Sequence, residues 1–333
     1  MNVQTYPATW RSHTFRAMGG TMAIWLELSN MATAETLLRE AEAMFARAER
    51  RLSRFDPHSE LAQLNANPGT WVPVSSMLWH VAMQARHMAR ETDGLFDFTQ
   101  LTALEAAGYT RSFTDRFFWE DATEDKLEPP DAWFGQWEAV QVHAEGRSLW
   151  LPPGVKLDFG GIAKGYVAQQ VVDFLSDWGP CLVDASGDLT AGSAPTGWPG
   201  WPVAVTKPLT EATANPSADR ETQFPLWLVA GTMATSGIDY RRWPQNGRIA
   251  HHLIDPRTGQ PAQTDLLTAT VLAKTAVRAE AWATAALVAG HKLAHQRLTD
   301  KNLGAALIDH NGELTVTPAL APFINEPTTF PEQ

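Results

Sequence analysis

The sequence predicts an α+β fold, and three observations support this class. Segments that alternate apolar and polar residues and segments with apolar residues at helical spacing follow one another irregularly, which disfavours a doubly wound parallel sheet. Short turn sequences join several neighbouring strand-like segments, which indicates hairpins. The chain has 333 residues, of which 44% are apolar, so it can bury a sizeable core in one large domain or two smaller ones.

The N-terminal part of the chain predicts one strand followed by two helices. Residues 22–28 alternate as a strand does, and Ser29 or Asn30 can cap the helix that follows. A second helix is expected to begin near residues 75–76 and to end before Gly94. The apolar residues that recur at helical spacing in the first helix are Leu37, Leu38, Ala41, Met44, Phe45, Ala48 and Leu52.

The middle of the chain predicts a surface segment, three short strands and a helix. Residues 110–137 are charged, aromatic and without a clear period, which is typical of a surface excursion. Gly160 and Gly161 stand where the helix is expected to open. The three strands are expected at residues 138–144, 148–152 and 155–159.

The C-terminal half predicts further strands, a loop-rich region and one helix. Residues 192–225 are rich in Pro, Gly, Thr and Asn, so we expect them to be mostly loop around one strand. The helix is expected over residues 275–290 and ends at a glycine. The strands are expected at residues 181–185, 201–205, 226–231, 251–255 and 266–273.

Composition disfavours several classes of protein. The formal net charge is −11 and no cluster of Lys and Arg opposes it, so a nucleic acid is not an expected partner. Cys181 is the single cysteine, which excludes an intrachain disulfide and a cysteine-based metal site. No stretch approaches the ~18–20 apolar residues of a membrane span, and residues 1–20 lack the apolar core of a signal peptide. The sequence as written therefore predicts a cytoplasmic protein, or a periplasmic one if a leader has been removed.

The segment LDFGGIAKGYVAQQ, residues 157–170, places a carboxylate, two glycines and a lysine between a strand and a helix. Glycines let backbone groups approach a ligand closely, Lys164 can hold a phosphate, and Asp158 can accept a hydrogen bond from a ligand. The spacing matches neither a Walker loop nor the GxGxxG fingerprint. A tight corner with a capping aspartate and an exposed lysine is the alternative interpretation.

The segment HHLIDPRTGQP, residues 251–261, combines a histidine with a turn. Asp255 before a proline and Gly259 at the exit both favour a reversal of the chain. His252 enters this turn from a strand and can project into a cleft, where it can move a proton near neutral pH. The alternative is a hydrogen-bonded structural histidine.

The segment RAEAWATAALVAG, residues 278–290, places two oxygen-bearing side chains on one helix face. Glu280 and Thr284 are four residues apart, and together with backbone carbonyls they form an all-oxygen set that suits Mg²⁺. In the alternative, the hydroxyl of Thr284 bonds back to the helix and Glu280 is simply solvated.

The order of eight short segments resembles the ApbE family, the FAD:protein FMN transferases. The segments are FRAMGGTM, SRFDPHSELAQLN, DGLFDFT, LDFGGIAKGY, VDASGDL, TSGIDYRR, HHLIDPRTG and RAEAWATA, and they run from about residue 15 to residue 290. The resemblance implies an α+β fold of mixed sheets with flanking helices and a ligand cleft between two α+β halves. It also implies a domain over residues 15–295, which residues 296–333 complete as a C-terminal strand and tail.

In this family FAD and Mg²⁺ bind together, FMN moves to a threonine hydroxyl of a target protein, and AMP leaves. The resemblance therefore implies FAD as substrate, Mg²⁺ as cofactor and an acceptor protein with a target threonine as partner. Gly161, Glu280 and Thr284 correspond to the metal ligands, although the family normally has Asp at the position of Glu280. His252 is the expected proton acceptor, and Asp255 would orient its turn or hold a metal-bound water. The residues expected to contact FAD are Met18, Phe55, Leu95, Phe96, Asp97, Asp158, Lys164 and Ile254.

Two other functions remain open on the sequence. A Mg²⁺-dependent FAD pyrophosphatase would use water in place of the threonine and release FMN and AMP. A non-catalytic FAD-binding protein would bind the dinucleotide without turnover, and the glutamate at position 280 is the residue that bears on this alternative.

Overall fold

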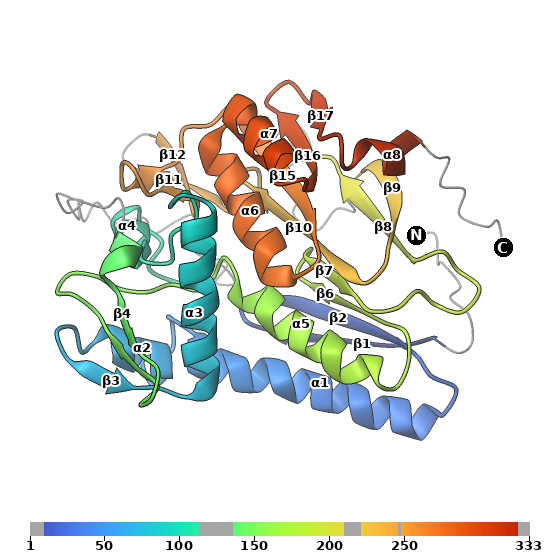
Figure 1. Cartoon of the computed structure of the whole chain (residues 1–333), viewed down its shortest axis with the longest axis horizontal. Coiled ribbons are helices and arrows are strands. Elements are labelled where there is room, and N and C mark those ends of the chain that lie inside the picture. Colours follow the sequence, from blue (N-terminus) through green and yellow to red (C-terminus); the bar gives the residue numbers. More distant parts are fainter. Residues whose placement is uncertain (1–9, 113–135, 210–220, 246–247, 326–333) are drawn as a thin grey trace.

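The computed structural model describes residues 10–112, 136–209, 221–245 and 248–325. Its centre is an eight-stranded sheet in which every neighbouring pair of strands is antiparallel (Figure 1). In spatial order the strands are β1 (Trp10–Ala17), β2 (Gly20–Glu27), β6 (Cys181–Ala185), β7 (Leu189–Ala191), β10 (Gly231–Gly237), β15 (Leu266–Ala273), β16 (Gly304–Asp309) and β17 (Leu314–Val316).

Helices cover one face of this sheet (Figure 1). Four of them pack on its strands, and α3 packs on α1 and α6. Buried apolar side chains from both layers form the main core, among them Phe45, Val171 and Leu287 from helices and Ile24 from β2. The helices are α1 (Met31–Leu52), α3 (Ser76–Glu91), α5 (Ala163–Ser176), α6 (Ala276–Ala289) and α7 (His291–Asp300).

A two-stranded ribbon packs on a second core at the other side of the sheet. The ribbon pairs β8 (Trp201–Thr206) with β9 (Thr222–Leu228), and α8 (Ala321–Asn325) contacts it. Tryptophans fill this second core, and the ring centroids of Trp10 and Trp201 lie 4.8 Å apart. The sheet is thus buried between a helical layer and a smaller aromatic layer.

Short elements form a third region beside α3 (Figure 1, left side). A small separate core joins α4 to the ribbon of β11 and β12, and Trp243 Nε1 donates to the Ala107 carbonyl at 2.8 Å. The elements are α2 (Glu60–Asn65), β3 (Trp71–Pro73), α4 (Leu101–Ala106), a 3₁₀ turn (Gln136–Ala139), β4 (Gln141–His143), β5 (Ser148–Trp150), β11 (Arg242–Gln245), β12 (Arg248–His251), β13 (Ile254–Asp255) and β14 (Gln260–Pro261).

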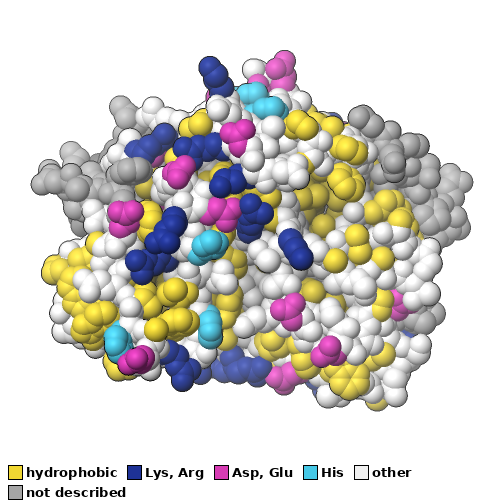
Figure 2. Space-filling view, viewed as in Figure 1, with side chains coloured by type: hydrophobic (Ala, Val, Ile, Leu, Met, Phe, Trp, Pro, Cys, Tyr) yellow, Lys and Arg dark blue, Asp and Glu magenta, His cyan; other side chains and the backbone are white. Residues whose placement is uncertain are grey.

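The surface over the helical face is mixed in charge. Figure 2 shows acidic and basic side chains interspersed there with apolar and uncharged ones. Among the helices of the described residues, none combines the length and the apolar character that a membrane span requires.

The α+β class and the long helices are confirmed. Asn30 caps α1 by accepting from the Thr33 N–H, and Ser75 caps α3 in the same way. Helix α6 ends at Gly290, whose φ of +76° lies in the region that favours glycine. These helices combine a strong apolar period with cap residues at their ends, which explains why the sequence predicts them.

Several predicted strands are wrong or shifted. Residues 155–159 form only one bridge, between Lys156 and Gln100, because their backbone bonds instead to the Asn65 side chain and to a loop. The strand expected at residues 226–231 contains the turn between β9 and β10, where Ala230 has a φ of +45°.

Other differences concern strands that were not predicted and elements whose ends differ from the prediction. Strands β1 and β10 were not predicted, and the run over residues 251–255 is broken between β12 and β13. Helix α5 begins at Ala163, two residues after the glycine pair. Of the expected surface excursion, residues 113–135 lie outside the described part of the chain.

Candidate active site

Residues 158–161, which precede α5 and include Gly160 and Gly161, form a corner that we call the glycine corner. It lies against Phe96 and α6. Asp158 holds the corner, since its N–H donates to the Phe98 carbonyl at 2.8 Å and its Oδ1 accepts from the Gly160 N–H at 3.0 Å. A Cβ at Gly161 would lie 3.2 Å from the Phe96 ring and 4.0 Å from Thr284 Oγ1. The exposed Gly161 carbonyl accepts no hydrogen bond from any residue that the structure describes. Gly161 therefore lies close to Thr284, and no described residue donates to its carbonyl.

A buried charge cluster lies where α5 meets α6. Both carboxylate oxygens of Glu280 accept from the Gly165 N–H at 3.1 Å. Lys164 Nζ lies 3.9 Å from Glu280 Oε1 and 3.9 Å from Asp188 Oδ2. The side chains of Glu280, Lys164 and Asp188 are 4%, 13% and 13% exposed, so their charges interact with little screening by water.

The two carboxylates of this cluster resist ionisation. Burial raises the pKa of Glu280 well above its usual value, and Lys164 opposes that rise. Burial also raises the pKa of Asp188, and Lys164 opposes that rise as well. Lys164 and the charge of Arg241 oppose the rise at Asp188 but do not overcome burial, so the two carboxylates favour holding a proton or taking up a further cation.

The oxygen atoms around this cluster fit a magnesium ion. Gly161 offers a carbonyl, Glu280 a carboxylate, and Thr284 a hydroxyl that lies 3.1 Å from Ser236 Oγ. Mg²⁺ prefers oxygen ligands and is commonly held by one or two carboxylates with water and phosphate. Within the described residues no group of three or more His, Cys, Asp and Glu is arranged to hold a metal ion.

The two neighbouring histidines have different surroundings. His251 is buried, with Nε2 3.0 Å from the Ala262 carbonyl and Nδ1 accepting from the Leu253 N–H at 3.3 Å. His252 follows the end of β12, and its buried Nδ1 has no hydrogen-bond partner within the described residues. Burial, Arg241 and His251 lower the pKa of His252 well below its usual value. His252 is thus a neutral imidazole with a free ring nitrogen.

Asp255 organises the turn that follows His252. Arg257 forms a bidentate ion pair with its carboxylate, with Nε 2.8 Å from Oδ1 and Nη2 2.8 Å from Oδ2. The Asp255 carbonyl accepts from the N–H groups of Thr258 and Gly259. Arg257 Nη2 also donates to the Val288 carbonyl at 3.2 Å, which ties the turn to α6. This geometry suits the orienting role expected of Asp255.

The residues expected to contact FAD fall into different environments. Leu95 and Phe96 are buried, and burial raises the pKa of Asp97 to about 6, partly offset by Thr99. Met18 has a φ of +49° at the turn between β1 and β2. Phe55 is 39% exposed, whereas Ile254 is buried in the small core with Trp243.

Three residues of the site were assigned no role from the sequence. Asp188 follows a turn that the sequence indicates only as a reversal after the strand at 181–185. Arg241 lowers the pKa of both His252 and Asp188, so its charge lies near both groups. Arg54 Nε lies 3.8 Å from Asp158 Oδ2. All three lie in segments that carry the family resemblance, SRFDPHSELAQLN, VDASGDL and TSGIDYRR, but nothing in the local spacing assigns them a role, which becomes visible only in the fold.

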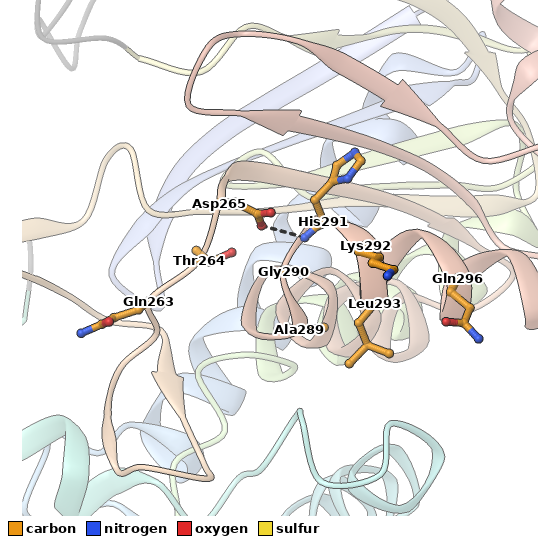
Figure 3. A pocket seen from close by; sticks show the side chains of 9 residues that line it. All are labelled: Gln263, Thr264, Asp265, Ala289, Gly290, His291, Lys292, Leu293 and Gln296. Atoms are coloured by element: carbon orange, nitrogen blue, oxygen red, sulfur yellow. Dashed lines mark hydrogen bonds between the residues drawn. The ribbon is translucent and has the colours of Figure 1, made fainter.

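Two hollows in the surface lie elsewhere. One, of about 430 Å³, lies at the start of α7, where Asp265 Oδ1 accepts from the His291 N–H at 2.7 Å (Figure 3). The other, of about 730 Å³, is lined by α1 and Phe174. Neither contains a residue of the glycine corner or of the charge cluster, so the geometry and chemistry of the side chains define the site.

The structure thus combines an antiparallel sheet with a glycine corner and a buried Lys–carboxylate cluster, an arrangement that can bind a phosphate group. The chain belongs to the ApbE family, whose family model matches residues 18–308, and the predicted membership is therefore confirmed.

Named relatives and solved structures agree with this membership. The FAD:protein FMN transferase of Haemophilus influenzae is 28% identical, over 88% of this chain and 84% of that protein. The ApbE protein of Thermotoga maritima is 24% identical and superposes with a TM-score of 0.81, covering 95% of this chain and all of that one. The flavinyl transferase ApbE of Pseudomonas stutzeri, in its apo form, is 23% identical with a TM-score of 0.77, covering 95% and 96% of the two chains. At these identities the solved structures support the fold.

Proposed function

We propose that this chain transfers FMN from FAD to a threonine hydroxyl of an acceptor protein, with Mg²⁺ as cofactor. The family and the name of its Haemophilus influenzae relative support flavin transfer from FAD. The observation that carries the proposal further is the cluster of Lys164, Asp188 and Glu280 beside the glycine corner. Such a cluster suits a phosphate group that must be bound and kept close to a cation.

The reaction breaks the phosphoanhydride bond of FAD and forms a phosphoester bond. The threonine oxygen bonds to the phosphorus of the FMN half, and the bond from that phosphorus to the bridging oxygen breaks. AMP leaves with the electron pair of that bond, while the threonine proton passes to a base. When bound by Gly161, Glu280 and Thr284, Mg²⁺ would offset the negative charge of the pyrophosphate.

The side chains of this chain would supply the remaining functions. Lys164 brings a positive charge that two buried carboxylates hold in place, so it can bind a phosphate oxygen. His252 offers a neutral Nδ1 without a partner among the described residues, which can accept the threonine proton. Asp255 and Arg257 would hold the turn that positions the imidazole.

Mass spectrometry of a candidate acceptor tests the proposal. The purified chain is incubated with FAD, Mg²⁺ and an acceptor that contains the threonine, and a matched acceptor carries alanine at that position. We expect an FMN-sized mass gain on the first acceptor only, together with AMP. Release of FMN and AMP at the same rate without an acceptor, and no mass gain, would identify a pyrophosphatase. FAD binding without release of any product would identify a non-catalytic flavin-binding protein.

A further inference from the structure

Arg54 is held rigidly beside the candidate site. Its side chain is only 6% exposed. The guanidinium carbon lies 4.1 Å from the centroid of the Phe55 ring and 4.4 Å from that of the Tyr109 ring. Nη1 donates to the Tyr109 carbonyl at 2.9 Å. Two ring contacts and one hydrogen bond fix both the position and the plane of this guanidinium.

One donor and one acceptor remain unfilled at this place. Arg54 Nη2 is buried and has no hydrogen-bond partner within the described residues. Asp158 Oδ1 accepts from Gly160, but no described residue donates to Asp158 Oδ2, which lies 3.8 Å from Arg54 Nε. A buried donor without a partner is unfavourable, so the arrangement is stabilised when a ligand supplies the missing acceptor.

We propose that Arg54 and Asp158 together recognise the edge of a heteroaromatic ring of the bound dinucleotide. Arg54 Nη2 donates to an oxygen or nitrogen of the ring, and Asp158 Oδ2 accepts from the neighbouring N–H. Arginine suits this task better than lysine, because its planar group presents donors at fixed angles. The exposed Phe55 ring beside the pair offers an apolar face to the same ligand.

The inference rests on the proposed function, because it takes FAD as the ligand. FAD contains two rings with a suitable edge. The flavin ring has an N–H between two carbonyl groups, and adenine has an amino group beside a ring nitrogen. Both present an acceptor next to a donor, so binding to the two halves of FAD must distinguish them.

Ligand titration on matched variants tests the inference. FAD, FMN and AMP are titrated against the wild type, Arg54→Lys, Arg54→Gln and the control Arg51→Gln. Lysine keeps the charge and removes the planar donor group, whereas glutamine removes the charge. Arg51 is a near neighbour with an exposed side chain, 3.9 Å from Glu60, so its replacement should leave all three affinities unchanged. Thermal melting of each variant shows that it is folded.

We expect both Arg54 variants to bind FAD about 10- to 100-fold more weakly, as the loss of a hydrogen bond from a charged group predicts. The loss should recur with FMN if the flavin is recognised, or with AMP if adenine is recognised, but not with both. Unchanged affinities would overturn the inference, as would an equal weakening of FMN and AMP, which a purely structural role predicts. An equal effect of Arg51→Gln would also overturn it. Failure of the proposed function looks different, because the wild type would then modify no acceptor even where it binds FAD and where Arg54 contributes to that binding.

Discussion

Replacing Gly165 with alanine tests whether the backbone of α5 holds the Glu280 carboxylate. The new Cβ would overlap Glu280 Oε2 and would lie 2.7 Å from Glu280 Cδ and 3.0 Å from Ala276 Cβ. Both neighbours belong to α6, which packs on α5 and cannot withdraw without disturbing the main core. The carboxylate must therefore leave the Gly165 N–H.

The size of the effect follows from three opposing contributions. Alanine favours the helix by about 1 kcal/mol relative to glycine. Overpacking costs about 1–3 kcal/mol, and leaving the buried Gly165 N–H without its acceptor costs about 1–3 kcal/mol. The two losses outweigh the gain, so we expect the free energy of unfolding to fall by about 2–4 kcal/mol. Transfer of FMN should fall at least about 100-fold, because a displaced Glu280 no longer lies beside Lys164.

Denaturant unfolding and single-turnover FMN transfer measure both effects on the same preparation. Gly304→Ala is the matched control, since a Cβ there meets its nearest neighbours at 3.6 Å, an ordinary contact. If Gly165→Ala matched this control in stability and in rate, the carboxylate of Glu280 would not be held by this backbone, and the reasoning would be refuted.

Three further predictions concern the carboxylates and the histidines. Glu280→Gln should change the free energy of unfolding by no more than about 1 kcal/mol, because the raised pKa already favours an uncharged carboxyl. The same variant should abolish Mg²⁺-dependent transfer, whereas Glu280→Asp should retain it. A glutamine variant whose transfer rate is within twofold of the wild type would exclude Glu280 as a metal ligand. His252→Ala should slow single-turnover transfer by ~10²–10⁴-fold with nearly unchanged FAD affinity. His251→Ala should mainly lower the melting temperature. The reverse pattern would contradict the roles assigned to the two rings. Asp97 has a folded-state pKa of about 6 against an ordinary value of 3.8, so the folded state binds more protons than the unfolded state between these values and stability falls as pH rises through them. Asp97→Asn should remove this fall and raise the free energy of unfolding at pH 7 by about 3 kcal/mol, as pH-dependent denaturation can test, and an unchanged slope would show that Asp97 does not titrate in this window.

The sequence predicts those elements whose local pattern agrees with their final environment. Helices α1, α3 and α6 have strong periods and end at recognisable cap residues. Strand β10 has the sequence GTMATSG, which lacks the bulky residues typical of strands, because α6 packs closely against it and Ser236 meets Thr284. Its strand character comes from its neighbours in the sheet, so no local pattern could predict it.

The candidate site divides in the same way. Motifs indicate Lys164, His252 and Glu280, because each stands in a segment whose spacing suggests chemistry. Asp188 is far in sequence from Lys164 and from Arg241, and only the folded sheet brings their charges together. The break after His251 was also hidden, because a continuous strand and a bent one share the same apolar run.

The bond from Arg257 to the Val288 carbonyl has a consequence for catalysis. It fastens the turn that follows His252 to α6, the helix that carries Glu280 and Thr284. The proposed proton acceptor His252 and the proposed cation ligands Glu280 and Thr284 are therefore joined in one unit, and their relative alignment is set when the chain folds. In the proposed reaction the acceptor threonine would therefore meet a preorganised site, so the entropy of aligning these groups would not be lost again in each turnover.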